Sequence, residues 1–191
     1  PMDHAVSNQA NVWGTGIYKV DGVAAGYSGE GMVVAVLDTG LDSSHAAFRT
    51  MPASARLNKE EVKNKIFDET YSDTGLLALN KKVTVDNVYY NEKVPFAYDY
   101  ADNDPDVYPS YSSHGTHVAG IIAGTATGDI IRDLDGNPIL DKEGNEMTFL
   151  GVAPNAQLAI CKVFTDKETA EGLGGAETVD ILAALEDCVK L

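Results

Sequence analysis

The chain carries Ser113-His114-Gly115-Thr116-His117-Val118-Ala119-Gly120, and earlier it carries Val34-Ala35-Val36-Leu37-Asp38-Thr39-Gly40. The apolar run at 32–37 has no polar alternation, which is typical of a strand buried on both faces of a parallel sheet. The small apolar residues after His114 favour a helix that ends near Gly124 or Gly128. We therefore expect Asp38 at the carboxyl end of a strand and His114 at the start of a helix. The carboxyl ends of strands are where α/β folds place reactive side chains.

The rest of the chain shows further strand and helix patterns. The apolar run at 158–164 predicts a second buried strand, and the apolar spacing over 177–191 predicts an amphipathic helix. Strand and helix in alternation indicate an α/β protein with a parallel sheet. The remaining expectations are a helix over 58–69 capped by Asn58, a hairpin of strands 83–90 and 93–100, an aspartate-rich loop over 101–109, a hairpin within 128–150, and a leading segment at 8–27 anchored by Trp13.

Three blocks of sequence, in order, resemble the subtilisin-like serine proteases. They are the run that ends at Asp38-Thr39-Gly40, the run that begins at Ser113-His114, and residues 151–164. Residues 44–48, the long segment before His114 and residues 93–100 are similar to the large cell-envelope proteinases of lactocepin type within that family. The resemblance implies a three-layer α/β parallel sheet of subtilisin type, incomplete in this fragment. It also implies that residues 1–191 are the amino-terminal portion of a peptidase domain, with 49–111 and 124–150 as family-variable insertions.

The resemblance also implies roles for individual residues. In an Asp–His–Ser triad, His114 is the implied general base, and Asp38 orients its ring and stabilises the imidazolium. Gly174, Gly175 and Ala176 are implied to form the edge that pairs with an extended peptide; a flexible glycine loop is the alternative. No serine of this chain lies in the Gly-Thr-Ser-x-Ala setting of the family, and its oxyanion-hole asparagine is not found either.

The implied function is peptide-bond cleavage by a serine endopeptidase. The isolated fragment is expected to be inactive, because it has neither the nucleophile nor the oxyanion donor. The alternative is a non-catalytic module of the same family that binds peptides or a partner protein.

Other chemistries use residues of the same motifs. The Asp38-Thr39-Gly40 run is also the aspartic-protease signature, which would need a dimer to pair two carboxylates and would leave the histidine segment without a role. His114 and His117 stand three apart and could share a helical face as metal ligands, but we expect His117 to pack against the sheet. The glycine at 136 comes too early in 133–137 for an EF-hand loop, so a turn is expected there. Ala47 stands where many subtilisins have a calcium-binding aspartate; we expect no metal and no cofactor.

The composition limits the partners. A formal net charge of −15 argues against nucleic-acid binding, which needs clustered Lys and Arg. No apolar run is long enough to span a membrane, and no signal peptide is visible. The family resemblance implies a polypeptide substrate and a secreted or cell-surface location in a Gram-positive bacterium. Cys161 and Cys188 give no disulfide framework and are expected to be small buried hydrophobic residues. An incomplete sheet would have an unprotected edge, so self-association through that edge is expected.

Overall fold

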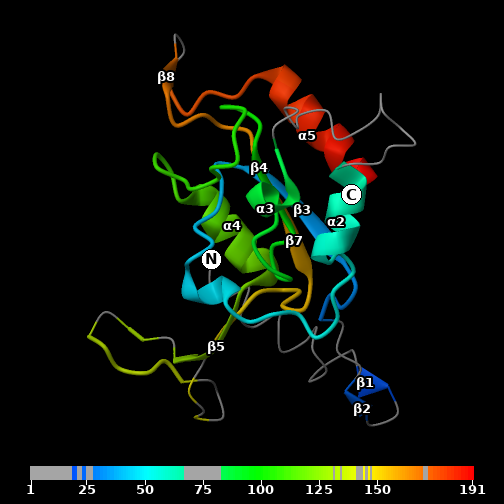
Figure 1. Cartoon of the computed structure of the whole chain (residues 1–191). Helices are drawn as coiled ribbons and strands as arrows, with labels where there is room; N and C mark the ends of the chain where they lie inside the picture. Colours follow the sequence, from blue (N-terminus) through cyan, green and yellow to red (C-terminus); the bar gives the residue numbers. More distant parts are fainter. Residues whose placement is uncertain are drawn as a thin grey trace.

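The computed structural model describes residues 19–20, 23–24, 28–66, 83–130, 132–133, 135–140, 144, 146, 148–169 and 172–191. In these residues a central parallel sheet has helices on both faces, which confirms the predicted three-layer α/β fold (Figure 1). Trp13 and the part of the predicted 58–69 helix beyond residue 66 lie outside the described residues. Of the leading segment, the structure describes only β1 (Lys19–Val20) and β2 (Val23–Ala24), which pair antiparallel.

The sheet consists of three parallel strands in the order β3-β7-β4. These are β3 (Val33–Asp38), β7 (Gln157–Lys162) and β4 (Phe96–Asp99). The central strand β7 is buried along its whole length, as its apolar sequence predicts. The register pairs Lys162 with Asp38 on one side and with Asp99 on the other. Three charged residues therefore end the three strands in one row.

Successive side chains of β7 enter opposite cores, because side chains alternate along a strand. Leu158 and Ile160 join the core under α4 (His114–Ala123) and η1 (Ala46–Phe48). Ala159 and Cys161 join the core on the other face, beneath the other helices. Those helices are α2 (Lys59–Ile66), α3 (Val85–Val88) and α5 (Thr178–Lys190).

The predicted helices begin and end at residues with clear local causes. The backbone N–H of Glu61 donates to Oδ1 of Asn58 at 3.0 Å, and the N–H of Asn58 donates to Oε2 of Glu61 at 2.8 Å. This reciprocal pair satisfies two donors at the start of α2. Helix α4 ends at Ala123, with Gly124 as its extended C-cap. Helix α5 matches the predicted 177–191 helix to within one residue at each end.

In the described part of the chain, three short pairs of antiparallel strands extend from the sheet and its helices. Besides β1 and β2, they are β5 (Thr125–Ile130) with β6 (Thr148–Leu150), and β8 (Glu168–Thr169) with β9 (Gly172–Leu173). The β5–β6 pair confirms the hairpin predicted over 128–150, since isolated bridges at 132–138 and 140–146 continue it.

The predicted hairpin of strands 83–90 and 93–100 is wrong. Residues 85–88 form the short helix α3, and β4 pairs in parallel with β7. The apolar residues Val85 and Val88 stand three apart, so they share a helical face as readily as they fit an alternating strand, and both are buried. The N–H of Thr84 donates to Oδ1 of Asn87 at 2.9 Å, which closes the first helical turn.

Strand β3 is less buried than its apolar sequence predicts. Only Val36 is fully buried, and Ala35 is exposed. The cause is position: β3 lies at one edge of the sheet formed by the described strands. Self-association through this edge stays a prediction. None of the helices in the described part of the chain is long and apolar enough to cross a membrane.

One buried lysine stabilises the loops at the amino ends of the strands. The side chain of Lys93 is fully buried, and its Nζ donates to the carbonyls of Pro154 at 2.5 Å and Ala156 at 2.9 Å. Burial disfavours the charged form and lowers the pKa of Lys93 to about 8.

The lowered pKa of Lys93 predicts an unusual dependence of stability on pH. The pKa of lysine in the unfolded chain is about 10.4, so between about pH 8 and 10 the unfolded chain binds a proton that the folded chain has released. The free energy of unfolding should therefore rise with pH in this window, by about 2 kcal/mol from this group. Lys93→Met should remove that rise. Urea unfolding of both proteins at several pH values tests this, and equal slopes would contradict it.

Candidate active site

Asp38 and His114 meet at the carboxyl end of the sheet. Nδ1 of His114 lies 2.8 Å from Oδ1 and 2.9 Å from Oδ2 of Asp38. The Asp38 side chain is 13% exposed and that of His114 is 64% exposed. With the proton on Nδ1, the second ring nitrogen of His114 carries a lone pair on the exposed side of the pair. A buried acid thus fixes the tautomer of an accessible base.

The short distance between strand and helix depends on Gly115. A Cβ at this position would clash with the carbonyl oxygen of Gly40 and would lie 3.2 Å from Cβ of Asp38. Helix α4 can therefore approach the end of β3 only with a glycine at its second residue. This explains why the small residue follows directly after the histidine.

Thr39 connects the acid strand to both sides of the histidine. Its hydroxyl donates to the carbonyl of Ser112 at 2.7 Å and accepts the N–H of Gly115 at 2.9 Å. Its own N–H donates to Oδ1 of Asp38 at 2.7 Å. One threonine therefore fixes the backbone before and after His114 relative to the carboxylate.

We expect Thr39→Val to disturb the site while Thr39→Ser preserves it. Valine has the shape of threonine but has no hydroxyl, so Gly115 loses an acceptor and Ser112 a donor. Two lost hydrogen bonds predict a fall of about 1–3 kcal/mol in the free energy of unfolding. Serine keeps the hydroxyl and should stay within about 1 kcal/mol of the native protein. Urea unfolding measures both, and equal losses in the two variants would show that the hydroxyl is not responsible.

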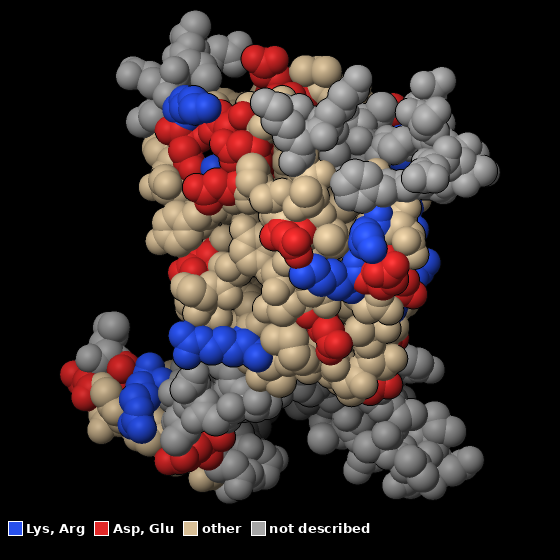
Figure 2. Space-filling model, in the orientation of Figure 1, with Lys and Arg blue, Asp and Glu red and all other residues tan. Residues whose placement is uncertain are grey.

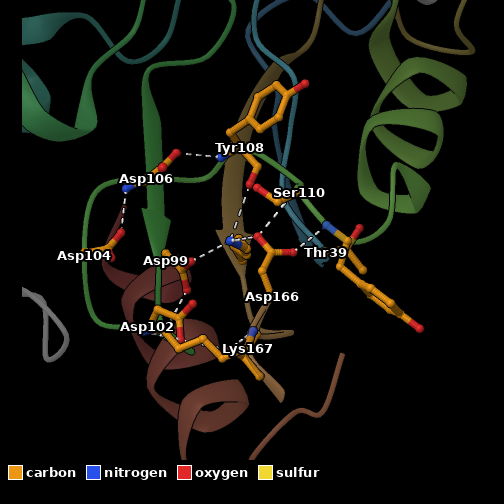
Figure 3. Close-up of polar contacts among 12 residues, drawn as sticks. Thr39, Asp99, Asp102, Asp104, Asp106, Tyr108, Ser110, Asp166 and Lys167 are labelled. Carbon is orange, nitrogen blue, oxygen red and sulfur yellow. Dashed lines mark hydrogen bonds and ion pairs between the residues drawn. The ribbon is translucent and has the colours of Figure 1, made fainter. Parts of the chain in front are cut away.

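Lys162 is the centre of a second polar cluster. It stands next to Asp38 in the register of the sheet. Its side chain is 4% exposed, and its Nζ lies 2.8 Å from Oδ2 of Asp99 and 2.7 Å from Oδ2 of Asp166. Figure 3 labels these two aspartates, whose carboxylates lie close together. Asp99 is itself 1% exposed. Nζ also donates to the carbonyl of Tyr108 at 3.4 Å. This single buried cation at the end of β7 is therefore shared among the end of β4, the loop that follows β4 and the segment that follows β7.

Asp166 continues this cluster toward the histidine. Its carboxylate accepts the backbone N–H of Ser110 at 3.2 Å and of Tyr111 at 2.8 Å. The chain then reaches Ser112, whose carbonyl Thr39 binds, and enters α4 at His114. The position of the base thus depends on a chain of contacts that begins at Lys162.

The environment of each group in this cluster shifts its pKa. Burial raises the pKa of Asp99, and the opposing hydrogen bond from Lys162 does not cancel the effect. Burial acts to lower the pKa of Lys162, but hydrogen bonds to Asp166 and Asp99 outweigh it and raise that pKa. Burial acts to raise the pKa of Asp166, but hydrogen bonds from Lys162 and the two backbone N–H groups lower it. Lys162 therefore stays charged throughout the neutral range.

The predicted peptide-binding segment lies beside the loop that leads to the histidine. Gly174 has a φ of +76°, and a Cβ there would lie 2.8 Å from Cε1 of Tyr111. The N–H of Thr165 donates to the carbonyl of Gly175 at 3.0 Å. Ala176 follows, half-buried, before α5 begins. The structure thus brings Gly174 to Tyr111, three positions before His114.

The placement of His117 differs from the prediction, and the structure also bears on the alternative chemistries. His117 does not pack against the sheet: it is exposed, because Gly115 and Ala119 occupy the buried face of α4. Within the described residues, no three His, Cys, Asp or Glu side chains are placed to hold a metal ion. The carboxylate of Asp38 is already engaged by His114, which leaves it unsuited to the pairing that an aspartic protease needs.

The surface around the site is acidic. Figure 2 shows acidic side chains gathered at the upper left of the molecule, toward the end where β4 terminates in Figure 1. One aspartate of the 101–109 loop at this end is Asp102. Its carboxylate accepts a hydrogen bond from the Thr165 hydroxyl and forms an ion pair with Lys167. Lys167, in the segment that follows β7, therefore neutralises part of this acidity.

The sequence motifs identified Asp38 and His114 but not the residues that position them. Thr39, Lys162 and Asp166 were not singled out. Thr39 stands next to the acid, which is a signal that could have been used. Lys162 and Asp166 are separated from His114 by about 50 positions in the sequence, so only the register of β7 beside β3 and β4 reveals their role.

Comparison with known proteins identifies the same family that the sequence motifs resemble. The sequence profile of the subtilase family matches residues 29–185. The PII-type proteinase of Lactococcus lactis subsp. cremoris is 34% identical over 197 residues, which cover 100% of this chain and 8% of that protein. The C5a peptidase of Streptococcus pyogenes serotype M18 is 31% identical over 167 residues, which cover 85% of this chain and 12% of that protein. The chain therefore spans only a small part of the length of the curated relatives it matches.

Proposed function

The chain belongs to the subtilase family, and from that premise we propose that it carries the acid and the base of a serine endopeptidase. The observation that supports the proposal most directly is the pair of distances, 2.8 and 2.9 Å, between the buried carboxylate of Asp38 and Nδ1 of the exposed His114. A serine hydroxyl is a weak nucleophile near neutral pH and needs such a positioned base.

In the proposed mechanism, Nε2 of His114 takes the proton from a serine hydroxyl as that oxygen attacks the scissile carbonyl. Asp38 keeps its hydrogen bond to Nδ1–H and stabilises the imidazolium that forms. His114 then gives the proton to the leaving amine. The serine and the oxyanion donor are proposed to lie outside these 191 residues, so this chain alone is proposed to be inactive.

Gly174, Gly175 and Ala176 are proposed to pair with the backbone of an extended polypeptide substrate. Two contacts support this assignment. Gly174 packs against Tyr111, next to the histidine loop, and Gly175 is anchored by Thr165. These contacts support a defined conformation for the segment, and the flexible glycine loop stays its alternative. The relatives suggest a location in the cell envelope of a Gram-positive bacterium, which we also propose for this protein.

Active-site labelling tests the proposal. A fluorophosphonate should label the complete protein that contains this chain, at a single serine, and should not label residues 1–191 expressed alone. Mass mapping of the labelled peptide identifies the nucleophile. A folded complete protein that resists labelling would overturn the enzymatic assignment.

The second candidate is a non-catalytic module of the same family that binds peptides. It predicts saturable binding of an extended peptide with no cleavage, measured by calorimetry and by mass spectrometry of the recovered peptide. The bond between Asp38 and His114 favours the enzyme, because a module that only binds peptides has no use for an acid–base pair.

A further inference from the structure

Two cysteine thiols lie in contact between the sheet and the last helix. Sγ of Cys161, on β7, is 3.4 Å from Sγ of Cys188, on α5. Cys161 is fully buried, as predicted, whereas Cys188 is only half-buried. The distance is close to the contact distance of two sulfur atoms, and a disulfide bond is about 2.05 Å long. To form a disulfide, the two sulfur atoms would have to approach by about 1.4 Å, from 3.4 Å to about 2.05 Å.

The surroundings make the two thiols unequal. The hydrogen bond from Cys161 lowers the pKa of Cys188, while the same bond and burial raise the pKa of Cys161. The thiolate is the reactive form, and Cys188 is also the less buried of the two cysteines. Cys188 is therefore suited to react first, and Cys161 to resolve the product.

We propose that Cys161 and Cys188 are a modification site that forms an intrachain disulfide on reaction with a small disulfide such as oxidised glutathione. The Cys188 thiolate attacks one sulfur of the reagent and forms a mixed disulfide, and one glutathione thiolate leaves and takes up a proton. Cys161 then loses its proton and attacks Sγ of Cys188, and a second glutathione leaves. The cysteine pair is oxidised by two electrons, and the reagent is reduced to two thiols.

The bond would join the two ends of the segment that carries the candidate peptide-binding residues. Residues 161–188 include Asp166, which positions the histidine loop, and Gly174, which contacts Tyr111. A disulfide that closes this segment restricts the unfolded chain and fixes α5 on β7. The inference does not depend on the proposed enzymatic activity, because it concerns two thiols on the far side of the sheet from α4.

Mass spectrometry of the chain in a glutathione redox buffer tests the proposal. After alkylation, the oxidised chain should contain one 161–188 disulfide and no alkylated cysteine. Its melting temperature should rise by roughly 5–10 °C relative to the reduced chain. In concentrated guanidinium chloride the disulfide should form at least about ten-fold less, because unfolding removes the proximity of the thiols.

Single variants supply the controls. Cys161→Ala should stop at the mixed disulfide with glutathione on Cys188, and Cys188→Ala should react little because its remaining thiol is buried. If one variant does not fold, as judged by circular dichroism, the other and the native chain still decide the outcome. The proposal is overturned if both thiols of the folded native chain remain free in an oxidising buffer, or if only chain-to-chain disulfides form.

Discussion

His114→Ala should lower kcat of the proposed peptidase, measured on the complete protein that contains this chain, by about 10⁶-fold, and Asp38→Asn should lower it by about 10⁴-fold. The first change removes the base, so the serine keeps its proton. The second leaves the ring in place but removes the charge that selects the tautomer with the proton on Nδ1 and stabilises the imidazolium. Because the two residues act as one unit, the double variant should be no slower than His114→Ala alone. Steady-state hydrolysis of a fluorogenic peptide measures all three.

His117→Ala is the matched control for this series. It removes the same ring from the same helix, one turn further along and on the exposed face. Its kcat should stay within about two-fold of the native value, because isolated surface substitutions have small effects. If His117→Ala caused a loss as large as that of His114→Ala, with both proteins folded, the assignment of the base would be wrong. If the double variant were far slower than either single variant, Asp38 and His114 would not act as a unit.

Lys162→Met should lower the free energy of unfolding by about 3–5 kcal/mol, the largest stability effect expected here. The substitution leaves Asp99 buried without its cation, 1% exposed beneath the loop that follows β4. It also removes the partner that holds Asp166 against the histidine loop. Chemical denaturation of the folded domain measures the loss, and a change below about 1 kcal/mol would contradict the proposed importance of the ion pair.

A double variant separates the effect of the Lys162 charge from the effect of its packing. In Lys162→Met/Asp99→Asn, the buried carboxylate is neutral, so at least half of the lost free energy of unfolding should return. Asp166 needs no matching substitution, because its side chain is 19% exposed and water can solvate its charge. If the double variant were as unstable as Lys162→Met, the cause would be the shape of the lysine and not its charge.

The sequence predicted the parts of this fold whose patterns are local. The strand before Asp38, the helix after His114 and the strand around Cys161 each have a periodicity of their own, and the structure confirms them. The pattern over 83–90 was ambiguous, because two valines three apart fit a helical turn as well as a strand. The strand predicted over 83–90 is wrong because the hydrogen bond between Thr84 and Asn87 favours a helical turn there.

The structure brings the two residues of the sequence motifs, Asp38 and His114, into contact, and it shows further contacts that the sequence did not predict. Asp38 and His114 could be found from sequence because each stands at a strand or helix end with a typical composition. The contact between Cys161 and Cys188 could not be found in this way, because it requires the placement of α5 on a particular face of β7. Burial of β3 was overestimated for a related reason, since hydrophobic composition does not reveal which strand lies at an edge.

The place of Gly174 beside Tyr111 limits the substitutions that this protein can accept. A Cβ at position 174 would lie 2.8 Å from Cε1 of the exposed tyrosine ring, and the φ of +76° strains any side chain there whatever the space, so a glycine is expected to be required at this position even where Tyr111 is replaced by a smaller residue. Replacing the loop that holds Gly174 should therefore succeed only with sequences that keep a glycine at this position, whatever residue stands at 111.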